Sequence, residues 1–138
     1  MYKNILVTLE STATDRAIIE HIKELARLTH SQVALLHVAD GWAARMFGPD
    51  AVSPEVVEDT AYLEKVRSEF QSIGIVTTAE LAYGEPGDEI VKWVEQHGCD
   101  LVAMSTHGHR FVADLFLGST SRHVRHKISV PLLLLRAK

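Results

Sequence analysis

Cysteine is almost absent from the sequence, with Cys99 as the only one among 138 residues. A single cysteine cannot form a disulfide within the chain, which excludes a disulfide-stabilised secreted scaffold and favours a reducing, cytoplasmic location. Because Cys99 lies at the start of a predicted buried strand, we interpret it as a packing residue rather than a nucleophile. No apolar run approaches the about 20 residues that cross a bilayer, and residues 1–4 lead directly into a strand, so we expect neither a membrane span nor a signal peptide.

Motifs of the common nucleotide-dependent and hydrolytic enzymes are also missing. The sequence has no Gly-x-x-x-x-Gly-Lys-Ser/Thr loop, no Gly-x-Gly-x-x-Gly after its first strand and no Gly-x-Ser-x-Gly nucleophile elbow. Cys-x-x-Cys and His-Glu-x-x-His are absent too. Catalysis therefore has no sequence signature here, and we expect no efficient catalysis.

Charge is distributed unevenly along the chain, whose formal net charge is −4. Residues 1–104 contain 8 Lys and Arg against 17 Asp and Glu, whereas residues 105–138 contain 6 against 1. The basic segment favours a small anionic ligand, and the acidic remainder argues against nucleic acid as a partner.

Apolar patterning predicts one α/β domain over residues 1–138, with strands and helices in alternation. Such alternation predicts a parallel sheet with helices on both faces. The first two strands are near-continuous apolar runs and should be buried on both faces, whereas the third alternates and suits a sheet edge. The expected strands are 3–9, 32–38, 75–83, 100–104 and 129–136; the expected helices run from the Glu10–Thr14 loop to about His30, and over 53–73, 88–97 and 119–127.

Helix boundaries have their own signals. Thr12 or Thr14 is the expected N-cap of the first helix, Ser53 and Pro54 begin the second, and Gly98 ends the third. Apolar spacing gives the expected core faces. They are Ile18, Ile22, Leu25 and Leu28 in the first helix, Leu63, Val66, Phe70 and Ile73 in the second, and Ile90, Trp93, Val94 and His97 in the third.

Residues 39–53 form a long loop that mixes turn residues with Trp42, Met46 and Phe47. A loop of this length in a compact domain is usually functional. We favour a flap that packs its aromatic residues on the core, and a lid or partner surface is the alternative.

The segment 105–121 connects a buried strand to a helix and carries Gly108 and Gly118. A glycine-bearing loop at a helix N-terminus presents free main-chain N–H groups, which together with the helix dipole favour an anion. The hydroxyl groups of Ser119, Thr120 and Ser121 are available at the same place. The pattern indicates a phosphate site, although the same residues also cap helices that bind nothing.

This segment resembles the nucleotide-binding signature of the universal stress protein family, Gly-x-x-Gly, nine residues, then Gly-Ser/Thr. Gly108 and Gly118-Ser119 match it, and Thr106-His107-Gly108 and the ending Val130–Leu135 are similar too. The first glycine of the signature falls on Ser105. The resemblance implies a Rossmann-like open sheet of five strands in the order 3-2-1-4-5. Ligands of such sheets bind where the strand order reverses, here between strands one and four.

The resemblance further implies an adenine nucleotide, namely ATP, ADP or AMP, with or without magnesium. The adenosine end would be held after strand one and at the end of strand two, where Glu10 replaces the usual Asp. The phosphates and ribose would be held by the segment 105–121. The residues implied are Leu9, Glu10, Val38, Ala39, Met104, Ser105, Gly108, His109, Gly118, Ser119, Thr120 and Ser121.

A metal site is a further hypothesis, because four histidines lie within twenty residues: His107, His109, His123 and His126. Zinc needs three or four converging ligands, usually with a carboxylate or cysteine, and Asp114 is the only acid close by in sequence. We therefore expect no metal, and place His107 in the hydrogen bonding of the loop.

The function expected is a cytoplasmic stress-response or signalling module that binds ATP without efficient catalysis. Two alternatives stay open: a dimeric interaction protein with a degenerate nucleotide pocket, and a slow phosphohydrolase. The apolar last strand would be exposed at a sheet edge, so something should cover it. The resemblance implies a homodimer through this strand, with Val130, Leu132 and Leu134 at the interface.

Overall fold

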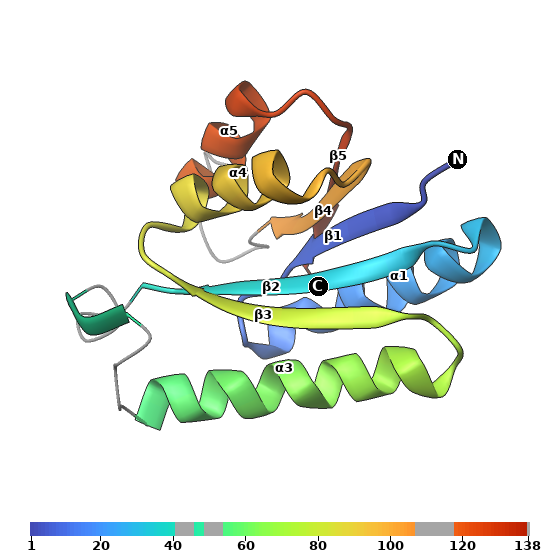
Figure 1. The fold of residues 1–138 in the computed structure, drawn as a ribbon, viewed down its shortest axis with the longest axis horizontal. Helices are drawn as coiled ribbons and strands as arrows, with labels where there is room; N and C mark the ends of the chain where they lie inside the picture. Colours follow the sequence, from blue (N-terminus) through green and yellow to red (C-terminus); the bar gives the residue numbers. More distant parts are fainter. Residues whose placement is uncertain (41–45, 49–53, 107–117, 138) are drawn as a thin grey trace.

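The structure is a computed structural model that describes residues 1–40, 46–48, 54–106 and 118–137. Strands and helices alternate along the chain as the sequence predicts (Figure 1). They are β1 (Asn4–Thr8), the 3-10 turn η1 (Ala13–Asp15), α1 (Arg16–Thr29), β2 (Gln32–Ala39), α3 (Pro54–Ser72), β3 (Thr77–Tyr83), α4 (Pro86–His97), β4 (Leu101–Thr106), α5 (Gly118–Lys127) and β5 (Leu132–Arg136).

The five strands form one parallel sheet in the order β3-β2-β1-β4-β5, which confirms the expected topology. Strand β1 lies at the centre, pairing Ile5 with Val33 of β2 and with Leu101 of β4. Its residues Ile5–Thr8 are buried, as a strand covered on both faces requires. Strand β3 is half-exposed at one edge and β5 lies at the other.

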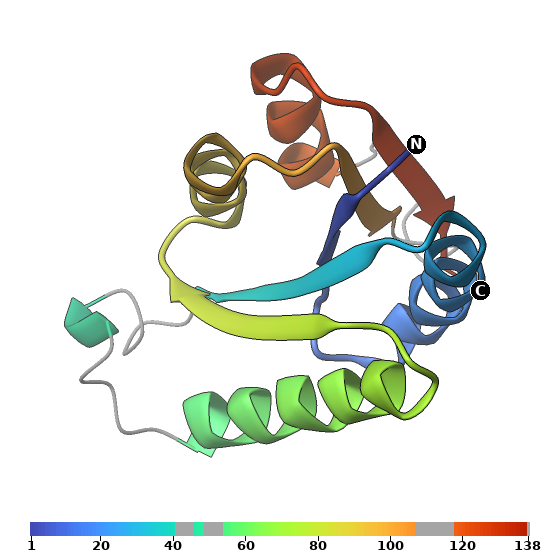
Figure 2. The same ribbon diagram turned by 45° about the vertical axis from the view of Figure 1, so that its right-hand side comes forward.

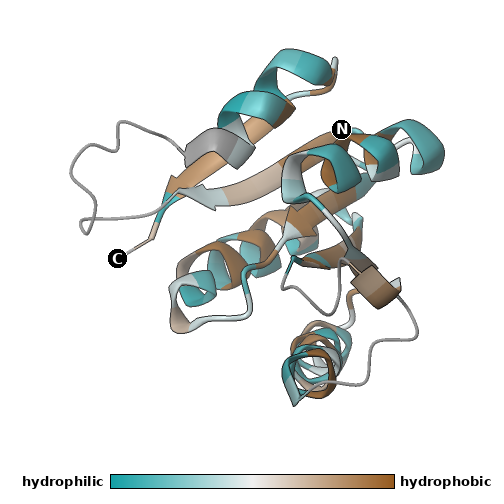
Figure 3. Cartoon of the chain, turned by 90° about the vertical axis from the view of Figure 1, so that its left-hand side faces the viewer, coloured by the Kyte–Doolittle hydropathy of each residue, from teal (hydrophilic) through white to brown (hydrophobic). Residues whose placement is uncertain are grey.

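Two helical layers cover the sheet. Helices α1 and α3 lie on one face, and α4 and α5 on the other (Figures 1 and 2). Phe70, Val66 and Ile22 belong to the first core, and Ile90, Val94 and Val124 to the second. In Figure 3 the helices alternate between apolar and polar residues, whereas the central strands are mostly apolar. No helix among the described residues is long and apolar enough to cross a membrane.

Thr12 is an N-cap, as expected, but of the 3-10 turn η1 that leads into α1, whereas α1 itself begins after Asp15. The side chain of Thr12 accepts from the N–H of Thr14, and the Asp15 side chain reciprocates in a capping box. Ile18 and Ile22 are buried as expected, but Leu28 is 80% exposed. The buried face is centred on Ile19 and Ile22, and at about 100° per residue Leu28 lies far around the helix from it.

In α3 and α4 the observed core face differs from the expected one at a single position each. In α3, Leu63, Val66 and Phe70 are buried, but Ile73 lies beyond the last turn and is 41% exposed. In α4, His97 is exposed on the last turn, where it stacks on Trp93 with ring centroids 4.1 Å apart.

Helix α4 begins at Pro86, two residues earlier than expected. Its N-cap is Glu85, whose Oε1 accepts from the N–H of Asp88 at 2.8 Å. The helix ends at Gly98, as predicted, in the left-handed conformation. Most of the 39–53 loop, Trp42 included, falls outside the described residues; Phe47 within it is 53% exposed.

The amino-terminal ends of β1 and β4 are joined by Asp100. Its carboxylate accepts from the N–H groups of Lys3 and Asn4 at 2.7 and 3.0 Å. The main-chain N–H of Asp100 donates to the carbonyl of Asn4 at 2.9 Å. Beside this junction, Cys99 is 5% exposed, and burial raises the pKa of its thiol, which fits the packing role expected.

Candidate functional site

A cavity of about 410 Å³ lies at the carboxyl ends of the strands, where β1 and β4 run side by side. The chain leaves β1 for helix α1 on one face of the sheet, and leaves β4 for α5 on the other (Figure 2). This is the switch point of the strand order, where open parallel sheets bind their ligands. The volume is in the range of small-molecule sites.

Seven of the residues predicted from the sequence come together in this cavity. They are Leu9, Glu10, Val38, Met104, Ser105, Thr120 and Ser121. Ala39 does not line it, because its side chain is buried and its carbonyl accepts from the N–H of Gly84 at 3.1 Å. Gly118 and Ser119 form the first turn of α5. Gly108 and His109 lie outside the described residues.

Six lining residues were not predicted. They are Thr8, Leu36, His37, Asp40, Pro86 and Ile90. The sequence does signal His37 and Asp40, since each is a polar residue at the carboxyl end of an otherwise apolar strand. Pro86 and Ile90 reach the cavity through the packing of α4 over the sheet, which no local pattern reveals.

The loop after β1 is shaped by a buried carboxylate. Asp15 is 0% exposed, and its Oδ1 accepts from the N–H of Glu10 at 2.8 Å. Its Oδ2 accepts from the N–H of Ser11 at 2.9 Å and from the hydroxyl of Tyr62 at 2.7 Å. With the N–H of Thr12, whose nitrogen lies 3.4 Å from Oδ2, four donors satisfy the buried carboxylate and fix the path of the loop. Burial, and then the Asp15 carboxylate, raise the pKa of the Tyr62 phenol.

His37 links the cavity wall to α3. Its Nδ1 lies 2.7 Å from the carbonyl oxygen of Leu9, and its Nε2 lies 3.2 Å from Oδ2 of Asp59. A carbonyl oxygen can only accept, so Nδ1 is the donor to Leu9, and Nε2 faces the Asp59 carboxylate. Side-chain exposures of 14% and 10% keep water from this contact, so it fixes the His37 ring at the cavity.

The β4 side of the cavity carries polar groups that face the start of α5. Among the residues that the structure describes, the Oγ of Ser105 is the buried side-chain oxygen without a hydrogen-bond partner. Ser121 is 4% exposed and Thr120 is half-buried. The first N–H groups of a helix have no acceptor within it, so this end of the cavity is rich in donors. A ligand or a water molecule that accepts a hydrogen bond can satisfy an orphaned hydroxyl there.

The family model of the universal stress protein family matches residues 1–136. Universal stress protein MJ0577 of Methanocaldococcus jannaschii is 27% identical over 157 aligned residues, covering 100% of this chain and 97% of the relative. A universal stress protein of Methanothermobacter thermautotrophicus is 30% identical, covering 91% of this chain and 90% of the relative.

Solved structures give the same result. The structure of MJ0577 matches with a TM-score of 0.84 at 28% identity, covering 100% of this chain and 98% of the other. Two more distant structures share the fold. A universal stress protein in complex with cAMP matches with a TM-score of 0.77 at 14% identity, covering 99% of this chain and 98% of the other. The universal stress protein from Archaeoglobus fulgidus in complex with dAMP matches with a TM-score of 0.71 at 20% identity, covering 96% of this chain and 97% of the other. With a family match over nearly its whole length, the chain belongs to the universal stress protein family.

Proposed function

We propose that the protein binds an adenine nucleotide, ATP or a close relative, in the cavity between β1 and β4, and acts as a stress-response or signalling module in the cytoplasm. The observation that carries the proposal is the convergence of seven predicted binding residues on one cavity, among them Ser105 with its orphaned hydroxyl. The complexes of two structural neighbours with cAMP and dAMP support an adenine ligand.

The adenosine end belongs at the carboxyl ends of β1 and β2. Leu36, Val38 and Ile90 give this part of the cavity apolar surfaces on which a flat base can pack. Glu10 offers a carboxylate for ribose hydroxyl groups, and Asp15 holds its main chain in place.

The phosphate end belongs at the N-terminus of α5. Main-chain N–H groups and the positive end of the helix dipole favour an anion there, and Thr120 and Ser121 add hydroxyl donors. Magnesium would accompany the phosphates, since it is usually held by one or two carboxylates together with phosphate oxygens.

Binding without efficient turnover is the favoured activity, because the sequence lacks the motifs that activate water or a nucleophile in known nucleotide hydrolases. The alternatives predict different results. A slow phosphohydrolase would release phosphate above the background of a Gly118→Val variant. An interaction protein with a degenerate nucleotide pocket would dimerise, but no nucleotide would raise its stability.

The proposal is tested on the purified chain by mass spectrometry of nucleotide released on heat denaturation, and by melting curves with ATP, ADP, AMP and GTP. A ligand at a hundredfold excess over its Kd should stabilise the native state by about 2.7 kcal/mol. We expect the adenine nucleotides to raise Tm and GTP to raise it less. If none of the adenine nucleotides moves Tm, the proposal fails.

A further inference from the structure

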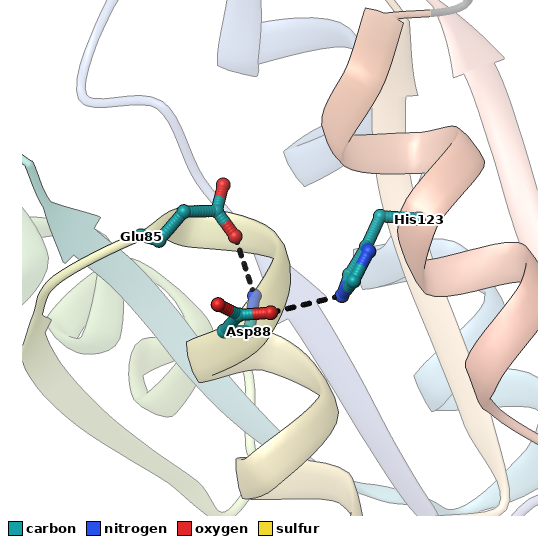
Figure 4. Close-up of side chains that lie close together, drawn as sticks. All are labelled: Glu85, Asp88 and His123. Atoms are coloured by element: carbon teal, nitrogen blue, oxygen red, sulfur yellow. Dashed lines mark hydrogen bonds and ion pairs between the residues drawn. The ribbon is translucent and has the colours of Figure 1, made fainter.

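Helices α4 and α5 bring together three side chains that are far apart in sequence. Glu85, Asp88 and His123 each offer one ligand atom, and the three atoms lie within 4.8 Å of one another (Figure 4). One pair, Nε2 of His123 and Oδ1 of Asp88, is 3.0 Å apart. None of the three lines the cavity, although Pro86, between the two acids, does.

The donor set suits zinc. Zinc takes imidazole nitrogen and carboxylate oxygen at about 2.0–2.2 Å in tetrahedral geometry, which separates the ligand atoms by roughly 3.4 Å. Here one pair of ligand atoms is 3.0 Å apart and no pair is more than 4.8 Å apart, so small side-chain rotations reach that value. An imidazole ligand disfavours magnesium and calcium, which prefer oxygen alone.

The three ligands are placed by packing that already exists. A Cβ added to Gly87 would lie 2.8 Å from Cδ2 of His123 and 3.2 Å from Oε1 of Glu85. The imidazole ring therefore sits against the main chain of α4, at a distance that only glycine permits. Glu85 is held by its hydrogen bond to the N–H of Asp88. Ligands on two packed helices are preorganised better than ligands on loops.

Simpler roles leave part of this arrangement unexplained. Glu85 caps α4 through one oxygen, and an exposed pair such as Asp88 with His123 contributes little stability. Two carboxylates in such a small space repel each other, and a single imidazole compensates for one of them at most. A divalent cation between them would remove that repulsion.

We propose that Glu85, Asp88 and His123 bind one zinc ion per chain, with a fourth position open to water or an anion. The ion joins the first turn of α4 to α5, the helix that brings Thr120 and Ser121 to the cavity. The site does not depend on nucleotide binding.

The test uses the untagged full chain, treated with EDTA and dialysed, with zinc chloride titrated in a calorimeter. We expect one site per chain. His123→Ala and Asp88→Asn should each lower zinc affinity by about tenfold or more, since even the loss of a residue that only hydrogen-bonds to a metal ligand lowers affinity by about that factor. Glu85→Gln removes the charge but keeps an oxygen that can cap α4. It should therefore lower zinc affinity while the chain still folds. His126→Ala, on the same helix, is the matched control and should bind as wild type.

Gly87→Ala gives an independent check, because it leaves all three ligands in the chain but displaces the imidazole ring. Zinc affinity should fall while the circular dichroism spectrum stays unchanged. Cobalt supplies a spectroscopic readout: visible absorption of a four-coordinate ion should appear in wild type and vanish in His123→Ala. The proposal is overturned if zinc binds more weakly than about 1 mM, or if His123→Ala binds as tightly as His126→Ala.

Discussion

The hydroxyl of Tyr62 donates to Oδ2 of Asp15 across 2.7 Å and so ties α3 to the loop after β1. That loop carries Glu10 into the cavity, and its main chain is held by the same carboxylate. A residue on α3, a helix that does not itself line the cavity, therefore shapes one of its walls.

Tyr62→Phe should lower the free energy of unfolding by about 1.5–3 kcal/mol, the usual contribution of a hydrogen bond to a charged group. Nucleotide affinity should fall as well, because the loop loses an anchor. Urea denaturation measures the first effect and calorimetry the second. Tyr83→Phe, in β3, is the control, and equal losses of stability in the two variants would contradict the assignment.

Glu69 should make the fold sensitive to acid. Arg16 donates to it at 2.7 and 3.2 Å, and these hydrogen bonds, together with one from Lys23 at 3.0 Å, lower the pKa of Glu69 from 4.5 to about 2. Because the folded-state pKa is depressed, the stabilisation is complete above pH 4.5 and is lost as pH falls toward 2. Arg16 is 48% exposed, so the contribution should be about 1 kcal/mol or less.

The measurement compares urea midpoints of wild type and Glu69→Gln at about pH 6 and about pH 3. The variant should be less stable at the higher pH, and the difference should shrink at the lower one. Glu95→Gln, at an exposed position of α4, serves as the control. A difference that stays constant between the two pH values would refute the role given to Glu69.

Ser105→Ala should move stability and affinity in opposite directions. Without ligand, the variant no longer buries an unsatisfied hydroxyl, so the free energy of unfolding should rise, by about 1 kcal/mol. With ligand, it lacks one neutral hydrogen bond, and Kd for the nucleotide should rise about fivefold. Melting curves with and without ATP give both values. Unchanged affinity would mean that Ser105 does not touch the ligand.

Gly118→Val should abolish nucleotide binding while the chain stays folded. Gly118 is the first residue of α5, and a branched side chain there would crowd the phosphates and disfavour the start of the helix. Calorimetry with ATP, after circular dichroism has shown a native spectrum, decides the matter. A folded variant that binds as wild type would place the phosphates elsewhere.

The chain should form a homodimer through β5. Main-chain groups of Pro131 and Ala137 bond to β4, so by alternation those of Leu132 and Leu134 point away from the sheet. Leu134→Pro should therefore remove pairing with a second copy and leave β4 paired, whereas Leu133→Pro should disrupt the sheet. Light scattering should show a wild-type dimer at tens of micromolar, on the order of what a standard-size interface needs. A wild-type monomer there would rule the dimer out.

The central elements of the fold could be predicted because their signals are local. Continuous apolar runs predicted β1 and β2, and Thr12 predicted the start of the turn before α1. The strand order and its switch point came from the resemblance to the family. The errors lie near helix ends, where Leu28 is on the side of α1 away from its buried face and Ile73 follows the last turn of α3.

The polar clusters of the molecule could not be predicted, because each joins residues distant in the chain. Asp15 is an ordinary helix-start acid in sequence, and only the packing of α3 gives it Tyr62. His123 has one acid near it in sequence, Asp114, whereas the structure brings it to Asp88. Side-chain chemistry is local, but the partners of a side chain are set by the whole fold.

The Asp100 junction has a practical consequence for measurement. It fixes the chain at the amino ends of β1 and β4, opposite the cavity, and leaves Met1 93% exposed. The five residues of β1, at about 3.3 Å each, separate the two ends. A fluorophore attached at Met1 should therefore label the molecule without obstructing ligand entry. A linker attached there should immobilise it on a surface with the cavity still accessible.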